Sequence, residues 1–274
     1  MPDRFPRIKK GAMLMARKDG SDSHKADVLF TNSYLGLFVQ QRPAYWSKLL
    51  EMLYGDGRIR KFASVVEDIV EKFSFLALAK DQIAESEARR DPQKQFFVKY
   101  HTYSYIFMTK SFLDAVAVFI NESYGLKFNG GNIDLGKSHF IESLSTQNKP
   151  LAAEITKRQR WIGQVTKYRN NLIHRHGVYV GPIPTVPESM TDPRAIDLYI
   201  LEEPAYIPND PDFVVDKIYD GVEGEFIKVN SLVEEWIQKS FEIFDLALSS
   251  FTASFEVVPR ENGVGVIFTI RESR

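Results

Sequence analysis

The chain contains no cysteine among its 274 residues. Disulfide bonds, thiolate metal sites and cysteine nucleophiles are therefore excluded, and we expect a protein of the reducing cytoplasm. The sequence also lacks an uninterrupted apolar run of the ~20 residues that a membrane-spanning helix requires, since its most apolar stretch, 111–120, contains Asp114. The amino-terminal MPDRFPRIKK has no apolar segment behind its basic residues, so we expect neither a secretory signal nor a membrane partner.

The net charge is also close to zero, because the chain has 35 basic and 36 acidic side chains. This balance argues against a polyanionic partner, but the charges are unevenly distributed along the chain. Residues 1–187 carry 28 basic and 18 acidic side chains, whereas residues 188–274 carry 7 and 18. Residues 155–187 hold six Lys or Arg and no acidic residue. This segment predicts a surface for a polyanion, although a solvated basic helix beside an acidic neighbour has the same composition.

Apolar periodicity and turn signals predict a mainly α fold, a helical bundle with a small irregular β-containing insertion and a terminal hairpin. The predicted segments are a mobile basic arm (1–25), an N-terminal mostly helical segment (26–92), a helical core (93–177), an irregular acidic insertion with a few strands (178–229), and a closing helix with a C-terminal hairpin (230–274).

Start and stop signals place helices over about 59–90, 93–124, 135–145, 150–176 and 231–255. The second of these is apolar nearly all round, as expected of a central buried helix. A capping-box spacing at Ser231 and Glu234 predicts where the last helix begins. Short β-like runs at 197–201 and 213–215 predict strands, and Glu261-Asn262-Gly263 predicts the turn of the hairpin.

The basic helix ends in the sequence Tyr168-Arg-Asn-Asn-Leu-Ile-His-Arg-His-Gly177, which carries candidate chemistry. Arg169 falls on the apolar stripe of this helix, where its guanidinium must either extend to the solvent or find anionic partners. Asn170 and His174 are four residues apart and share a face, and the helix dipole favours a charged imidazole at His174. A guanidinium, an amide and a histidine can cleave an RNA phosphodiester without a metal: the guanidinium stabilises the phosphate and the imidazole moves the proton.

Plainer alternatives exist for each of these residues. Arg169 can pair with Asp114 or Glu122, and His174 can bond a backbone carbonyl, as residues near a helix C-terminus often do. Asn170 can serve local hydrogen bonding. Because no cysteine or nearby carboxylate accompanies His174-x-His176, we predict no metal and no cofactor. The aromatic residues at the start of the 93–124 helix can stack bases or belong to the core.

The spacing Arg169-Asn170-x-x-x-His174 resembles the Arg-x4–6-His signature of the HEPN domain superfamily. KSFLDAVAVFINESYG, Asn132-Ile-Asp-Leu and YRNNLIHRHG look like the body of a HEPN bundle, so the resemblance covers about 93–177, with 231–255 as a closing helix. It leaves the first 90 residues and the insertion unexplained. Where HEPN toxins controlled by a nucleotidyltransferase carry a modified Tyr, two residues after the motif His, this chain has His176.

The resemblance implies a metal-independent endoribonuclease of a toxin–antitoxin or phage-defence system, with an active site built across a homodimer. In such an enzyme Arg169 would hold the scissile phosphate and His174 would act as the general acid or base. Asn170 would position Arg169 or His174. Asp114 is expected to support Arg169, and the expected RNA contacts are Lys167, Arg175, His176 and Arg160. Expected partners are RNA, a second copy and an antitoxin or defence protein.

Two other hypotheses stay open. The first is a catalytically inactive HEPN module that binds nucleotide, RNA or a partner protein. The second is a purely structural helical protein whose acidic C-terminal third folds back on its basic helix. The same charge complementarity suggests that the acidic insertion acts as a lid over the basic helix.

Overall fold

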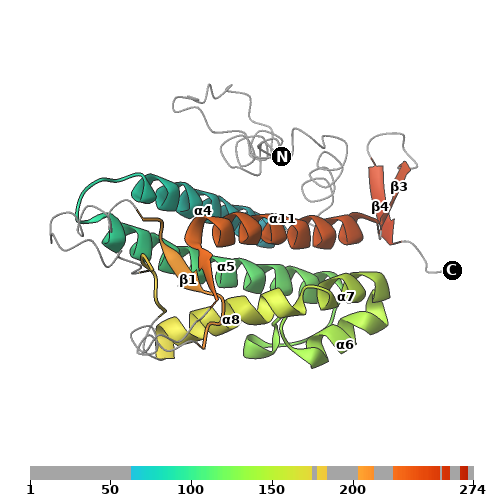
Figure 1. Cartoon of the computed structure of the whole chain (residues 1–274). Coiled ribbons are helices and arrows are strands. Elements are labelled where there is room, and N and C mark those ends of the chain that lie inside the picture. Colours follow the sequence, from blue (N-terminus) through green and yellow to red (C-terminus); the bar gives the residue numbers. More distant parts are fainter. Residues whose placement is uncertain are drawn as a thin grey trace, which may run out of the picture.

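The computed structural model describes residues 63–174, 178–183, 203–212 and 225–253, together with the backbone of strands 255–259 and 266–270. These residues form a mainly helical bundle with two small two-stranded sheets (Figure 1). The elements are α4 (Ala63–Glu87), α5 (Lys94–Ser123), η2 (Gly130–Asn132), α6 (Ser138–Gln147), α7 (Lys149–Thr156), α8 (Gln159–His174), β1 (Tyr206–Pro208), β2 (Phe226–Lys228), α11 (Val229–Ala253), β3 (Phe255–Pro259) and β4 (Val266–Ile270). The predicted basic arm, residues 1–25, lies outside the described residues.

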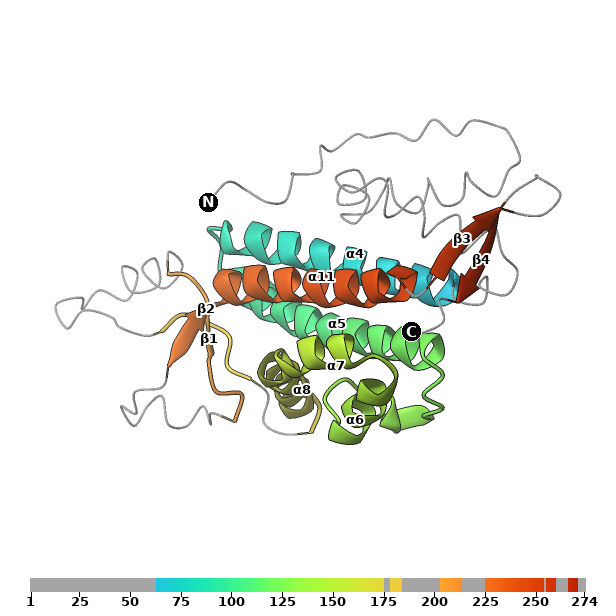
Figure 2. The ribbon, with the colours of Figure 1, turned by 90° about the vertical axis from the view of Figure 1, so that its right-hand side faces the viewer.

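Helix α5 is the centre of the bundle, as its apolar composition predicts. It lies between the pair α4 and α11 on one side and the layer of α6, α7 and α8 on the other (Figures 1 and 2). The ring of Phe112 contacts Phe73 from α4 and Phe244 from α11, with ring centroids 5.8 and 6.1 Å apart. Further along, Phe119 meets Phe251 edge to face at 5.2 Å. These tilted and edge-on contacts are the geometries that aromatic rings prefer in a core.

Burial also explains why α5 is so apolar. By length and composition α5 is, within the described part of the chain, a helix that could cross a membrane, but most of its apolar window is buried inside the bundle. A core helix that is covered on most faces has the same composition as a membrane span. The finding is consistent with the expectation of a soluble protein.

The closing helix begins two residues before the predicted capping box. Helix α11 starts at Val229, so Ser231 and Glu234 lie within its first turns and the capping-box prediction is wrong. The backbone N–H of Val229 instead donates to the carbonyl of Ala205 at 2.9 Å. One orphan donor of the helix N-terminus is thus satisfied by a segment distant in sequence.

The predicted continuous helix over 150–176 is wrong, because the structure divides it into α7 and α8. Between them, Arg158 N–H donates to the carbonyl of Ile155 at 2.9 Å, a tight turn in place of the helical i→i−4 bond. At the first residue of α8, Gln159 Nε2 donates to the carbonyl of Leu135 at 2.5 Å. This hydrogen bond anchors the start of α8 to the loop before α6.

Two antiparallel strand pairs decorate the bundle. Strand β1 pairs with β2, with Ile207 opposite Ile227, beside α8 and the start of α11. Strand β3 pairs with β4, with Phe255 opposite Ile270 and Pro259 opposite Val266, which confirms the predicted C-terminal hairpin. The runs at 197–201 and 213–215, predicted to be strands, lie outside the described residues.

Candidate functional site

Two buried side chains fix the position of α8. The Tyr168 hydroxyl donates a hydrogen bond to the carbonyl of Pro208, and Asn171 Nδ2 donates to the carbonyl of Pro211. Burial raises the pKa of the Tyr168 hydroxyl, so the phenol keeps its proton and remains a donor. Part of the acidic third is thereby held against the basic helix. Sequence reasoning missed both residues, although polar side chains three apart on a buried stripe are a signal of such anchoring.

Arg169 is half-buried, and its Nη1 donates to Asn170 Oδ1 at 3.1 Å. Among the described residues it forms no ion pair with Asp114 or Glu122, so the predicted pairing is not present. Asp114 pairs with Lys110, whose Nζ also lies 3.2 Å from Asp134. Burial raises the pKa of Asp114, and the charges of Lys110 and Arg169 oppose this rise. Arg169 therefore acts on Asp114 through its field and not through a direct contact.

Asn170 and His174 are both exposed, and His174 is the last residue of α8. Residues four apart in a helix share a face, whereas residues five apart are rotated by about 140° and displaced by about 7.5 Å. The structure thus brings Arg169 together with Asn170, and directs Arg169 and His174 of one chain to different sides of α8. Arg175 and His176, predicted to contact RNA, lie outside the described residues.

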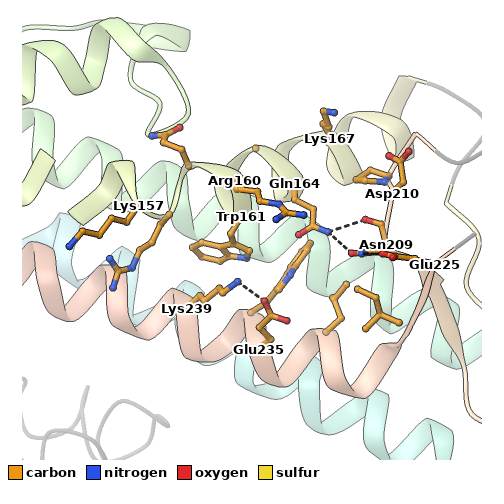
Figure 3. A pocket seen from close by; sticks show the side chains of 17 residues that line it. Lys157, Arg160, Trp161, Gln164, Lys167, Asn209, Asp210, Glu225, Glu235 and Lys239 are labelled. Atoms are coloured by element: carbon orange, nitrogen blue, oxygen red, sulfur yellow. Dashed lines mark hydrogen bonds and ion pairs between the residues drawn. The ribbon is translucent and has the colours of Figure 1, made fainter. Parts of the chain in front are cut away.

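A groove of about 1000 Å³ runs beside α8 (Figure 3), and Arg169 is not among the residues that line it. We call it the α8–α11 groove, and its walls are formed by α8, α11 and the segments 209–211 and 225–227. Arg160 and Lys167, predicted to contact RNA, both line it. Sequence reasoning missed the groove because α8 lies more than forty residues before the segments that form its other walls.

The polar side chains of the groove are mostly held by neighbours. Gln164 Nε2 donates to the carbonyl of Asn209 at 3.1 Å, and Lys167 pairs with Asp212 at 3.3 Å. Arg160 is exposed and has no ion-pair partner in the described part of the chain. Such a cation can bind an anionic ligand without first losing a partner.

Trp161 lies deep in the same groove, where its side chain reaches from α8 toward α11 (Figure 3). The residue is 3% exposed, and its indole N–H finds no acceptor among the described residues. This nitrogen is itself buried, so the unsatisfied donor costs about 1–3 kcal/mol and is closed to a ligand in the groove.

In the described ranges, no three His, Asp or Glu side chains gather closely enough to hold a metal ion.

Comparisons of the chain with protein-family models, with curated proteins and with solved structures gave no match.

Proposed function

We propose that the chain is a HEPN-like, metal-independent endoribonuclease of the cytoplasm that acts in a toxin or phage-defence system. One observation carries this proposal: the exposed end of a basic helix presents Arg169, Asn170 and His174 within two turns, with the guanidinium and the amide hydrogen-bonded. A guanidinium, an amide and a histidine are the kinds of group that support phosphodiester cleavage without a metal.

The proposed reaction is an internal transfer within the RNA. His174 accepts the proton of a ribose 2′-OH, O2′ attacks phosphorus, and the bond from phosphorus to O5′ breaks. The guanidinium of Arg169 binds the non-bridging oxygens, whose negative charge grows in the transition state. The leaving O5′ receives a proton from an imidazolium, and the products are a 2′,3′-cyclic phosphate and a 5′-hydroxyl.

A second copy of the chain completes the proposed site. Because Arg169 and His174 are separated by about 140° around α8, one chain directs them to different sides. A homodimer that faces the two α8 ends toward each other supplies Arg169 of one copy and His174 of the other to one phosphate. It also supplies the two imidazoles that the proton transfers require.

The decisive experiment is cleavage of single-stranded RNA in excess chelator by the wild type and by Arg169→Ala, His174→Ala and the double variant. We expect His174→Ala to lose about 100- to 10,000-fold in rate, the range for an acid–base group, and Arg169→Ala about 100- to 1,000-fold, the range for one donor to the transition state. His139→Ala, which removes another exposed histidine, serves as the matched control and should cleave normally. Equal cleavage by the double variant and the wild type would falsify the proposal.

A catalytically inactive module that binds nucleotide, RNA or a partner protein is the second candidate. It is favoured by the contact of Arg169 with Asn170, which occupies part of the guanidinium. This function predicts RNA binding without cleavage, and cellular toxicity that is unchanged in His174→Ala. An antitoxin or other defence protein would then be the partner to seek by co-purification.

A further inference from the structure

Exposed apolar side chains gather on one pair of helices. The described residues include five large hydrophobic or aromatic side chains that are exposed, and four of the five lie on α4 or α5. These four are Phe75 and Leu78 on α4, at 45% and 54% exposed, and Phe96 and Tyr100 on α5, at 67% and 57%. A single exposed apolar residue is ordinary on a protein surface, whereas a cluster on two neighbouring helices indicates an interaction surface. We call this surface the α4–α5 face.

Ring contacts connect the two helices at one end of this face. The short connection 88–93 joins α4 to α5, so the two helices run antiparallel beside each other (Figures 1 and 2). Just beyond the end of α4, the guanidinium of Arg89 lies over the ring of Phe97, 4.5 Å from its centre. Phe97 meets Phe96 edge to face with ring centroids 5.5 Å apart, and Phe96 stacks on Tyr100 at 6.4 Å. The end of α4 is thereby continuous with the exposed aromatic rings of α5.

The exposed stripe of α4 has the spacing of a seam between helices. Glu71, Phe75, Leu78, Gln82 and Glu85 follow one another at intervals of four, three, four and three residues. Side chains at these intervals stay on one side of a helix, and the same alternation lines the seam of a coiled coil. Gln82 is half-buried and the other four are exposed. The stripe therefore offers a further helix a place to pack that the described bundle does not use.

The outer stripe of α5 has the same spacing and carries no charge. Tyr100, Ser104, Phe107 and Ser111 follow at intervals of four, three and four residues, and each is exposed or half-buried. The serines are small, so large side chains of a packed helix fit between the aromatic rings as knobs fit into holes. The stripes of α4 and α5 together suit a single helix lying along the pair.

The two ends of the α4 stripe are negatively charged. Glu71 and Glu85 are exposed, and neither forms an ion pair with a Lys or Arg of the described residues. Burial lowers the pKa of His101 on α5 and the charge of Glu85 opposes this shift, which places Glu85 near α5. Carboxylates at the flanks of an apolar stripe favour a helix whose own apolar stripe is flanked by Lys or Arg.

We infer that the α4–α5 face docks an amphipathic helix of a partner protein. The apolar stripe of that helix packs on Phe75, Leu78 and Tyr100, and its flanks carry Lys or Arg. Helical recognition segments bind through apolar side chains at intervals of three and four residues. A second copy of this chain fits less well, because a two-fold contact centred on Leu78 brings Glu71 of one copy against Glu85 of the other. The docking site does not depend on RNA cleavage, and an enzyme and an inactive module would use it alike.

The test uses the full chain and a fluorescein-labelled synthetic helix as the probe. The peptide has Leu at the a and d positions of about three heptads and Lys at the e and g positions. Phe75→Gln and Leu78→Gln together should weaken its binding about tenfold or more in fluorescence anisotropy, because two large apolar contacts are lost. Ile173→Gln removes the fifth exposed apolar side chain, which lies on α8, and should leave the affinity unchanged. Circular dichroism and thermal melting check that each variant is folded.

A charge swap tests the flanks of the proposed helix. A second peptide carries Glu in place of Lys at the e and g positions, and a second variant carries Glu71→Lys and Glu85→Lys. We expect the wild type to prefer the lysine peptide by about threefold or more, and the charge-reversed variant to prefer the glutamate peptide by a similar factor. Both preferences should weaken at high salt, because the charges are exposed.

Three results would overturn the inference. The first is no binding of the lysine peptide to the wild type, or binding that is unchanged when Phe75 and Leu78 are replaced. The second is a peptide preference that does not reverse in the charge-reversed variant. The third is a dimer, seen in analytical ultracentrifugation, that dissociates in Phe75→Gln with Leu78→Gln, since the face would then belong to a second copy. The endoribonuclease proposal is tested separately, because none of these substitutions changes Arg169 or His174.

Discussion

The guanidinium of Arg169 donates a hydrogen bond to the side-chain oxygen of its neighbour Asn170 at 3.1 Å. Arg169 is half-buried and Asn170 is exposed, so the contact draws the guanidinium toward the solvent edge of α8. In the proposed enzyme Asn170 is therefore a positioning residue that acts through Arg169.

The two substitutions Asn170→Ala and Asn170→Asp should differ in their effect on cleavage. Alanine removes the restraint on Arg169, whereas aspartate forms an ion pair with it and repels the phosphate, so we expect kcat/KM to be about tenfold lower in the aspartate variant. The loss should be mainly a rise in KM, because the carboxylate competes with bound RNA. Melting temperature should not change, since Asn170 is exposed, and Asn132→Asp serves as a control for an exposed amide. Identical kinetics in the two variants would mean that Asn170 does not orient Arg169.

Removing the hydroxyl of Tyr168 should loosen the contact between α8 and the segment 206–212. In Tyr168→Phe the buried carbonyl of Pro208 loses its donor, which should lower the free energy of unfolding by about 1–3 kcal/mol. Tyr105→Phe is the contrast. The Tyr105 hydroxyl donates at 2.9 Å to the carbonyl of Val233, and this carbonyl also accepts a backbone hydrogen bond within α11. There we expect a smaller loss, of about 0.5–1.5 kcal/mol.

Urea unfolding with limited proteolysis separates these two cases. Tyr168→Phe should increase cleavage near residues 206–212 at low urea, because local opening precedes global unfolding. Tyr105→Phe should leave the cleavage pattern as in the wild type. A wild-type pattern in Tyr168→Phe would show that this hydrogen bond does not hold the segment.

Local patterns in the sequence predicted the elements whose stability is decided locally. The apolar content of 93–124 predicted the central helix α5, found at Lys94–Ser123, and alternating apolar runs around a turn predicted the hairpin of β3 and β4. In both cases the pattern along the segment alone identifies the type of element, although contacts with other elements stabilise it. The mainly α fold with small β additions followed from these patterns.

The features that depend on distant contacts could not be predicted in this way. The start of α11 depends on the carbonyl of Ala205, and the start of α8 on the carbonyl of Leu135. Periodicity also placed Arg169 on the buried side of its helix without revealing that Lys110 already neutralises Asp114. The α8–α11 groove exists only because chain segments separated by dozens of residues meet, so no local motif predicted it.

The stability of the fold should depend on pH through Glu87. Its carboxylate accepts hydrogen bonds from the N–H of Ala205 at 3.1 Å and from Asn230 Nδ2, and burial raises its pKa above the ordinary 4.5. A raised pKa means that the folded state binds this proton more tightly than the unfolded state. The contribution of the protonated Glu87 carboxyl to the free energy of unfolding is therefore complete below pH 4.5. It is lost as pH rises through the higher pKa that Glu87 has in the folded state.

Urea unfolding of the wild type and Glu87→Gln at a series of pH values measures this contribution. We expect the free energy of unfolding of the wild type, relative to the variant, to fall just above pH 4.5 and to level off at higher pH. The slope cannot exceed that of one proton, about 1.4 kcal/mol per pH unit. Parallel curves for the two proteins across this interval would assign the pH dependence to other groups.

Two glycines with equal space around them should respond to alanine in opposite ways. A β-carbon added at Gly163 or at Gly125 meets no atom within 4 Å. Gly163 lies inside α8, where alanine is favoured over glycine by about 0.5–1 kcal/mol, so Gly163→Ala should raise the free energy of unfolding by that amount. Gly125 has φ of +59°, a conformation that costs an L-residue about 1–2 kcal/mol, so Gly125→Ala should lower it.

Chemical denaturation of both alanine variants therefore tests backbone conformation independently of packing. A stability change of the same sign in both alanine variants would mean that conformation at Gly125 does not dominate.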